Sequence, residues 1–441
     1  QGKRGYIMVA VVGFAMIICI VALLLKGKMS PIVVLTVIPA VAALILGHGP
    51  VEIADFIKEG VKTTTNNGIL FIFSVIYFGV MSDTGMFDVI VNFLVKKAGN
   101  NVIAVTVATA IIATIAHLDG TTATTVLITI PALYPVYKAM KIDTKILLCL
   151  TGACMGVMNL LPWGGPVARA ATVLSMDAND LWHILIPIQI VGLIFNIVVA
   201  VLLGMLAIKQ GAGAGKGEKV EQDQKTKDEE IALRRPKLLF FNLALTIALI
   251  AVLSAGLVTS YVAFMIALSL ALAVNYPNLK TQDKLVKKHA PAALIISATL
   301  FSAGAMVGIF DGTGMLTEMA NAIMSIIPGF LGQFIHIIFG ILALPLGLCI
   351  GTDAYFYGIM PLVMQVGETY GVASLSTALT MVIGKNLALM VSPLVPATYL
   401  AIGLTDVELK DHMKFSIPIY WGISIVMLVI GVILGIVPLG A

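Results

Sequence analysis

Charged side chains are scarce in this sequence. Asp, Glu, Lys and Arg make up 11% of its 441 residues, and hydrophobic residues make up 59%, whereas soluble domains carry about 25% charged residues. So few charges cannot cover a globule with a surface that water solvates, which excludes a chain of ordinary soluble domains. The composition instead predicts a membrane protein, and the mean hydropathy of +1.03 agrees with it.

Cysteine and net charge are low as well. The four cysteines lie in apolar stretches and form no Cys-x-x-Cys pair, so neither a disulfide framework nor a cysteine zinc site is expected. The net charge of +4 is small and the cations are scattered along the chain. This distribution gives no basic patch for nucleic acid, and no such partner is expected.

Long charge-free runs are what the sequence has in abundance. A bilayer core needs about 20 apolar helical residues, so these runs predict an all-α polytopic membrane protein with ten crossings. The crossings are 6–25, 30–47, 66–82, 144–175, 183–208, 238–257, 261–276, 291–310, 372–402 and 415–437.

Two further charge-poor regions, 102–137 and 332–367, contain polar interruptions near their middles. Their tips, HLDGTT (117–122) and GTD (351–353), would be costly if lipid surrounded them, so they should face protein or water. We predict two helical hairpins that enter the membrane and turn back. Two full spans in each region is the alternative.

Lysine and arginine are distributed unevenly between the two sides of this topology. Of the 27 cations, 21 lie on the side reached after the first crossing and four lie on the other side. Because cytoplasmic loops carry the excess of Lys and Arg, the richer side should be the cytoplasm. Both termini should then be extracellular, and the polar segment 210–237 should be a cytoplasmic linker of a protein in the cytoplasmic (inner or plasma) membrane.

The two halves around that linker repeat their motifs. DTGM (83–86) matches GTGM (312–315), and NLLPWGGP (159–166) matches NLALMVSP (386–393). Each half has five crossings and one hairpin, and an odd number of crossings forces the second half to lie upside down. Residues 1–209 and 238–441 are therefore predicted to be inverted repeats, an arrangement typical of secondary transporters with a midplane site.

Proline and glycine interrupt one crossing of each half. NLLPWGGP lies inside 144–175, and NLALMVSPLVP lies inside 372–402. Proline removes backbone donors and glycine relaxes the chain, so both helices should break there and leave N–H and C=O groups free to bind anions or cations. A proline kink without a ligand is the alternative, but matched positions that each begin with Asn favour a site.

The hairpin tips carry hydroxyls and carboxylates. Thr121 and Thr122 open the returning part of the first hairpin, and Thr352 lies in the second tip. Short hydroxyls at a helix start suit the oxygens of a carboxylate substrate. Asp119 and Asp353 would each cost roughly 2.5–3.5 kcal/mol to bury in a membrane helix, which a metal ion or a proton would offset. Helix capping by Asp119, or a structural network for both, is the alternative.

Two cations do not fit the count by sides. Arg169 follows the first break and Lys385 directly precedes the second. A multi-carboxylate substrate would need such positive charge, and arginine can hold a carboxylate with two hydrogen bonds; pairing with Asp119 or Asp353 is the alternative. His117 flanks the first tip and could relay protons, with a packing role as its alternative.

These patterns define the candidate site. The predicted proton- or metal-coupling residues are His117, Asp119 and Asp353. The predicted substrate-binding residues are Gly120, Thr121, Thr122, Asn159, Gly164, Gly165, Arg169, Gly351, Thr352, Lys385, Asn386, Ser392 and Pro393.

The motifs resemble the citrate–divalent metal:proton symporter family (CitMHS), a branch of the ion transporter superfamily. The likeness covers nearly the whole chain. It is carried by LDG (118–120) with its threonines, MNLLPWGGPVARAA (158–171), TDAYFYGIMP (352–361) and SPLVPATYLAIGL (392–404).

This resemblance implies proton-coupled symport of citrate chelated to a divalent cation, Mg²⁺ or Ca²⁺, with no tightly bound cofactor. It also implies a homodimer in which a transport domain moves against a fixed scaffold, as in an elevator. The substrate role is carried over to Asn159, Asn386, the two tips and the two breaks. This chain departs from the family in one place: it reads LDGTT where family members often read LDGDG. This difference leaves the need for a metal ion open, and the substrate could be a related di- or tricarboxylate. Coupling to sodium instead of protons is also an open alternative.

Three rival functions were weighed against transport of an organic anion. An inorganic-ion antiporter, such as a sodium/proton antiporter, would show paired acids at the breaks without cations, and Arg169 and Lys385 argue against it. An intramembrane enzyme would need a nucleophile or a metal triad beside His117 and Asp119, and the sequence offers neither, so no enzyme is expected. A passive channel would not require hairpins that close on a midplane site.

Overall fold

The computed structural model describes residues 3–26, 28–213, 228–324, 329–349 and 351–440. Every regular element in these ranges is a helix, and they contain no strand. Eight helical segments are long and apolar enough to cross a membrane, and four further apolar helices are shorter, with 10–17 residues each. The prediction of an all-α polytopic membrane protein is confirmed.

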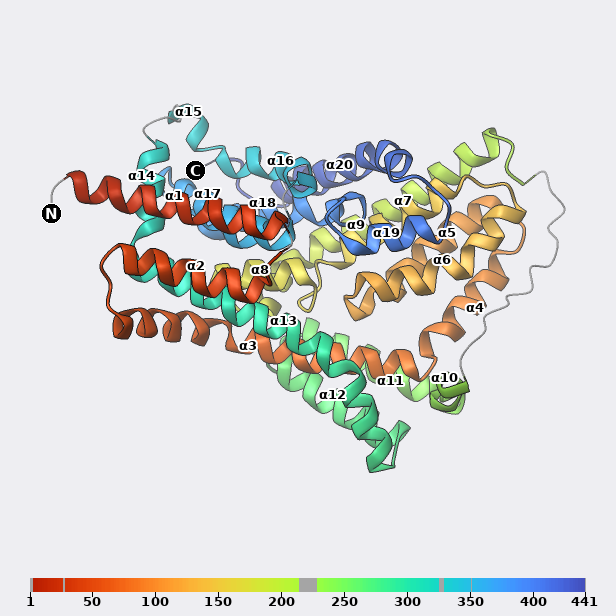
Figure 1. Cartoon of the computed structure of the whole chain (residues 1–441). Coiled ribbons are helices and arrows are strands. Elements are labelled where there is room, and N and C mark those ends of the chain that lie inside the picture. Colours follow the sequence, from red (N-terminus) through yellow and green to blue (C-terminus); the bar gives the residue numbers. More distant parts are fainter. Residues whose placement is uncertain (1–2, 27, 214–227, 325–328, 350, 441) are drawn as a thin grey trace.

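The first half of the chain runs from α1 to α9 (Figure 1). Its helices are α1 (Lys3–Lys26), α2 (Pro31–Ile45), α3 (Pro50–Asp83), α4 (Met86–Ala98), α5 (Val102–Ala116), η1 (His117–Asp119), α6 (Thr122–Ala139), α7 (Thr144–Met158), α8 (Gly165–Val173) and α9 (Ala178–Lys209).

The second half has the same order of elements. After α10 (Asp228–Leu233) and η2 (Pro236–Leu238) come α11 (Leu239–Ser254), α12 (Ser260–Asn275), α13 (Leu279–Thr313), α14 (Met315–Met324), α15 (Gly329–Gly332), α16 (Ile335–Cys349), η3 (Ala354–Ile359), α17 (Met360–Thr369), α18 (Ser374–Lys385), η4 (Asn386–Val391), α19 (Pro396–Gly403) and α20 (Leu409–Ile433). Residues 214–227 of the predicted linker and residue 350 of the second hairpin lie outside the described ranges.

Both predicted breaks are present. The first helix stops at Met158 and resumes as α8 at Gly165, with turns between them. The second broken helix changes at Asn386 from the α-helix α18 to the 3₁₀ helix η4. This 3₁₀ helix ends at Val391, before α19 begins. The prolines and glycines of these segments therefore interrupt the helices where the sequence predicts.

The two hairpin regions each fold as a pair of packed helices. The chain reverses after η1, where Gly120 has a φ of +70°, and α5 packs against α6. In the second hairpin, α16 packs against α17, and a π-helical stretch, η3, begins α17. The pairing is that of helical hairpins, and their depth in a bilayer stays a prediction.

The helices form two groups that lie side by side (Figure 1). One contains α2, α3, α12 and α13, and α3 packs along α13 over much of its length. The other contains both hairpins, both broken helices, α9 and α20, and it holds every residue of the candidate site. The two chain ends lie at one end of the molecule, and the end of α9 and α10 lie at the other (Figure 1).

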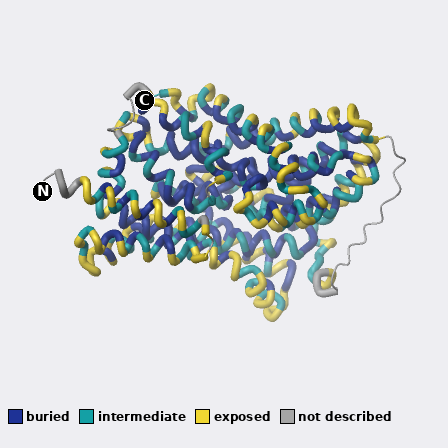
Figure 2. Tube along the Cα trace, turned by 45° about the horizontal axis from the view of Figure 1, so that its top comes forward, coloured by how far each residue is buried: buried dark blue, intermediate teal, exposed yellow. Residues whose placement is uncertain are grey.

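Glycine permits the close crossing of α3 and α13. Gly304, Gly308 and Gly312 recur every four residues on α13, and a Cβ at Gly308 would collide with the Phe56 carbonyl of α3. Gly60 of α3 meets Gly304 in the same way. Such stripes of small residues let membrane helices approach backbone to backbone. Buried residues lie where the helices pack together, and exposed residues lie on the outside (Figure 2). Many of the exposed residues are large and apolar, as expected of surfaces that lipid covers.

Candidate functional site

The first break leaves polar groups inside the protein. Asn159 ends α7 and is 2% exposed, and its Nδ2 has no hydrogen-bond partner within the part of the chain that the structure describes. A Cβ at Gly164 would collide with the Asn159 carbonyl, so the chain needs glycine there. No side chain caps the start of α8 at Gly164–Gly165. The break therefore offers amide donors, which suits a carboxylate.

The first hairpin tip rests on this break. His117 Nε2 lies 3.2 Å from Asn159 Oδ1, and Trp163 Nε1 donates to the Leu118 carbonyl at 2.7 Å. A Cβ at Gly120 would stand 3.1 Å from the Trp163 carbonyl oxygen. The tip and the break are thus locked together by direct polar contacts and close packing.

Asp119 hydrogen-bonds Thr121, the residue just before the returning helix α6, and has no basic partner among the described residues. Its Oδ1 accepts from Thr121 N at 2.9 Å, and its Oδ2 accepts from Thr121 Oγ1 at 2.6 Å. The residue is only 7% exposed. Asp119 therefore has a local role in fixing the turn before α6, and a coupling role for this buried carboxylate stays a prediction.

The second tip is held by both broken helices. Arg169 Nε donates to Asp353 Oδ1 at 2.6 Å, and Lys385 Nζ donates to Thr352 Oγ1 at 2.7 Å. Lys385 is 2% exposed, and its ammonium also lies 5.4 Å from the centre of the Phe356 ring. Arg169 and Lys385, the two cations that belong to neither side in the Lys and Arg distribution, thus bond adjacent residues of the second tip.

The second break begins with a buried side-chain amide that has no partner among the described residues. Asn386 is 2% exposed, and neither Oδ1 nor Nδ2 of its side chain has a hydrogen-bond partner among the described residues. The two breaks also touch, because a Cβ at Gly156 of α7 would lie 3.2 Å from the Asn386 carbonyl oxygen. A buried amide without partners is costly, so a ligand that satisfies Asn386 would gain that free energy.

Several predicted residues lie at the margin of this cluster. Ser392 is buried, and its Oγ lies 3.4 Å from the Leu348 carbonyl of the second hairpin. Pro393 is exposed, and its carbonyl accepts from Tyr399 OH. Gly351 has open space where a Cβ would stand. Thr122 and Gly165 are partly exposed at the starts of α6 and α8.

No group of three or more His, Cys, Asp or Glu side chains with metal-binding geometry occurs in the described ranges. The sites that the sequence marked for a metal, Asp119 and Asp353, each supply a single carboxylate.

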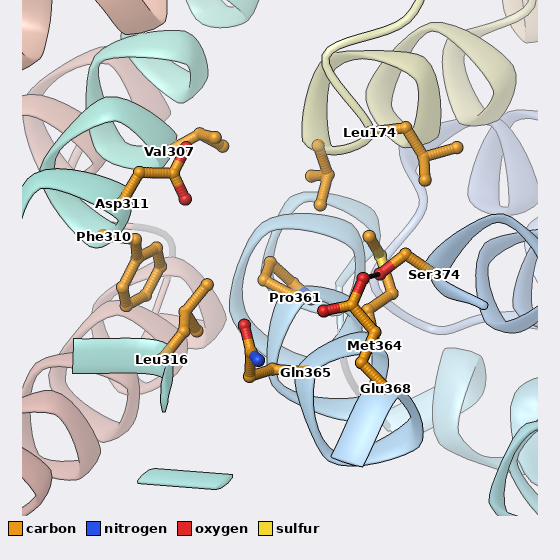
Figure 3. A pocket seen from close by; sticks show the side chains of 11 residues that line it. Leu174, Val307, Phe310, Asp311, Leu316, Pro361, Met364, Gln365, Glu368 and Ser374 are labelled. Atoms are coloured by element: carbon orange, nitrogen blue, oxygen red, sulfur yellow. Dashed lines mark hydrogen bonds between the residues drawn. The ribbon is translucent and has the colours of Figure 1, made fainter. Parts of the chain in front are cut away.

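A cavity of about 260 Å³ lies beside the cluster (Figure 3). One wall comes from α13 and α14, with Phe310 and Asp311, and the other comes from α8, α17 and α18, with Leu174 and Glu368. Its lining contains two carboxylates and no basic residue, so it is unsuited to bind a free tricarboxylate. It separates the two groups of helices, one turn along α8 from Arg169.

Sequence reasoning missed some of the polar contacts. Trp163 was not predicted to contact the first tip, although a tryptophan between Pro and Gly in a membrane segment is a signal. His412, Tyr420 and Gln189 were also missed, and each hydrogen-bonds a backbone carbonyl of a broken helix. The spacing of His412 and Tyr420, two helical turns apart on α20, is a signal for those two residues; Gln189 has no such pattern.

Comparison with known proteins gives consistent relatives. A family model described as Citrate transporter (CitMHS) matches residues 6–384. Two proteins of Bacillus subtilis (strain 168) are 35% identical: a Citrate transporter over 430 residues (98% of this chain and 100% of the relative) and a Mg(2+)/citrate complex secondary transporter over 438 residues (97% and 99%).

Two solved structures share the fold at 14% sequence identity. The YdaH transporter of Alcanivorax borkumensis has a TM-score of 0.59 and matches over 87% of this chain and 89% of its own. MtrF of Neisseria gonorrhoeae has a TM-score of 0.54, with 84% and 81% covered. At this identity they support the architecture alone.

Proposed function

This chain belongs to the CitMHS family of citrate transporters, and from that premise we propose that it is a proton-coupled symporter that carries citrate, as a complex with a divalent metal ion, across the cytoplasmic membrane. The relative named for the Mg(2+)/citrate complex supports the metal. The metal ion is cargo in this proposal and not a resident cofactor.

The convergence of cations and unpaired amides carries the proposal. Arg169 and Lys385 come from the two broken helices and reach one hairpin tip, and Asn159 and Asn386 begin the two breaks with unpartnered amide groups. Citrate presents three carboxylates and a hydroxyl, which need several donors and positive charge at once. Asp353 pairs with Arg169, so a citrate carboxylate would compete with it for the guanidinium.

A charge count gives the coupling that the proposal requires. Citrate is mainly a trianion at neutral pH, and a bound divalent metal leaves one negative charge. Each net charge that crosses the membrane is worth about 2.3 kcal/mol per 100 mV. An inside-negative potential therefore helps uptake only if two or more protons accompany the complex. Asp119 and Asp353 are the proposed carriers of a proton or contacts of the metal.

The proposed architecture is a pair of inverted repeats, residues 1–209 and 238–441, in a homodimer that works as an elevator. The same order of elements in the two halves supports the repeats. The cavity between α13 and the group of α8, α17 and α18 supports a moving domain that is loosely joined to a scaffold. Both termini are proposed to be extracellular, with the linker in the cytoplasm.

Substitution of the two break asparagines tests the site. Asn159→Ala and Asn386→Ala should each raise KM for citrate uptake at least about tenfold, because each removes a hydrogen bond to a charged group. Asn242→Ala is the matched control, since Asn242 is buried and bonded to Asn275 by two amide contacts of 3.0 and 2.8 Å. Near-normal KM in both break variants would overturn the proposed site.

Neutral substitutions of the two aspartates test the coupling. Asp119→Asn and Asp353→Asn keep the size of the side chain and remove its negative charge. At least one variant should lose the dependence of citrate uptake on the proton gradient or on the metal ion. If both transport citrate with unchanged pH and metal dependence, neither aspartate couples transport.

A further inference from the structure

One face of α20 carries four buried polar residues in a membrane-type helix. His412, Ser416, Tyr420 and Ser424 are 0%, 0%, 0% and 2% exposed, and each follows the previous one by four residues. This spacing aligns them on one side of a helix. Buried hydroxyls and imidazoles need partners, so the groups that they bond show what this polar stripe does.

The first two residues of the stripe serve the second break. His412 Nε2 lies 2.8 Å from the Met390 carbonyl in η4. A carbonyl can only accept, so Nε2 carries the proton and donates. Ser416 Oγ lies 3.2 Å from His412 Nδ1 and fixes the ring from its other side.

The last two residues serve both broken helices. Tyr420 OH donates to the Cys149 carbonyl of α7 at 2.9 Å, and Ser424 Oγ donates to the Gly384 carbonyl, next to Lys385, at 3.3 Å. α7 has a glycine where it passes this phenol, because a Cβ at Gly152 would collide with Tyr420 OH. One helix of the second half thus holds backbone carbonyls from both halves.

The last helix of the first half makes the corresponding contact. Gln189 of α9 reaches the Val157 carbonyl at 3.5 Å, and Trp182 Nε1 fixes the Gln189 amide at 2.8 Å. Val157 lies two residues before Asn159, and Gly384 lies two residues before Asn386. In each half, a donor from the last helix therefore bonds the carbonyl that lies two residues before the Asn of the break.

We propose that the α20 stripe, with Gln189 on α9, is a positioning element of the transport site, an inference that rests on the proposed function. The stripe supplies donors to the Met390 and Gly384 carbonyls beside the second break and to the Cys149 carbonyl in the middle of α7. Lipid offers polar groups no partners, so these bonds hold the two broken helices in one arrangement. Tyr420 bridges the halves and sets the distance between the two breaks. The stripe touches no substrate and acts through the placement of Asn159, Lys385 and Asn386.

Uptake kinetics of purified protein in proteoliposomes test this role. Tyr420→Phe and Ser424→Ala should each raise KM for citrate about 3- to 10-fold, as expected for one lost hydrogen bond, with kcat within about twofold. His412→Gln keeps an N–H donor and should restore most of the affinity lost in His412→Leu. Tyr276→Phe is the matched control, because it removes a buried phenol that donates to the Leu233 carbonyl at 2.8 Å, outside the broken helices.

Hydrogen–deuterium exchange gives a readout that does not depend on transport. Tyr420→Phe should speed amide exchange in peptides covering 146–165 and 384–395, and Tyr276→Phe should not. If the stripe variants change KM and this exchange no more than the control does, the stripe has only a general structural role and the inference is wrong. If the wild type takes up no citrate, the proposed function fails, and the exchange data alone still decide the positioning role.

Discussion

At the scale of single residues, the ion pair between Arg169 and Asp353 joins a broken helix to a hairpin tip. Both side chains keep about a fifth of their exposure, 19% and 21%. Water therefore screens the pair only in part, and each partner alone would leave a charge without its counterpart. The pair is either purely structural or the resting state of a substrate-binding arginine, and substitution can separate these roles.

Arg169→Ala and Asp353→Ala should each destabilise the protein by roughly 1.5–3 kcal/mol, the usual cost of losing a hydrogen bond between charged groups. The double variant should recover part of that loss, because no unpaired charge remains. Thermal melting in detergent checks the stability, and citrate uptake checks the function. A double variant that regains both stability and transport would contradict a substrate-binding role for Arg169.

The sequence identified Arg169 and Lys385 by their misfit with the count by sides, and the structure places both on the second tip. The sequence alone could not show that Arg169 pairs with Asp353 and not with Asp119. The paired residues are 184 positions apart, and only tertiary packing brings them together. Trp163 and Tyr420 were missed for a related reason, since neutral polar side chains leave no mark in a charge distribution.

At the scale of elements, the crossing of α3 and α13 depends on the absence of side chains. Gly308→Ala should destabilise the protein by roughly 1–3 kcal/mol, because the new Cβ meets the Phe56 carbonyl and the helices must move apart. Gly422→Ala on α20 is the control, because a Cβ there has open space and alanine favours a helix. Equal melting temperatures for both variants would contradict the close crossing.

Proline and glycine in NLLPWGGP and NLALMVSP predict the helix breaks, since the loss of a backbone donor is a local property. The form of the second break could not be predicted. Asn386–Val391 continues as a 3₁₀ helix, and Ala354–Ile359 is a π-helical stretch. Both departures from the α-helix depend on the side chains of neighbouring helices.

At the scale of the whole molecule, the cation count predicts the side of each connection. Leu257 follows α11 and Leu279 begins α13, and both are 70% exposed. In a variant without the native cysteines, Leu257→Cys should react with a membrane-impermeant thiol reagent added to intact cells. Leu279→Cys should react only after the cells are permeabilised. The reverse pattern would contradict the proposed orientation.

The order of the elements could be predicted from charge-free runs and motif repeats, and the two halves do share it. The division into two groups of helices could not, because it depends on which apolar faces pack together. The broken helices, the hairpins, α9 and α20 form one of these groups, and that grouping supports the proposed elevator.

Uptake of radiolabelled citrate by purified protein in proteoliposomes tests the central claim most directly. An inward proton gradient is imposed, and the medium contains Mg²⁺, Ca²⁺ or EDTA at equal free citrate. The account predicts accumulation that requires both the proton gradient and a divalent metal ion. Accumulation that is equally fast in EDTA, or that persists when the proton gradient is collapsed, would contradict proton-coupled transport of a metal–citrate complex.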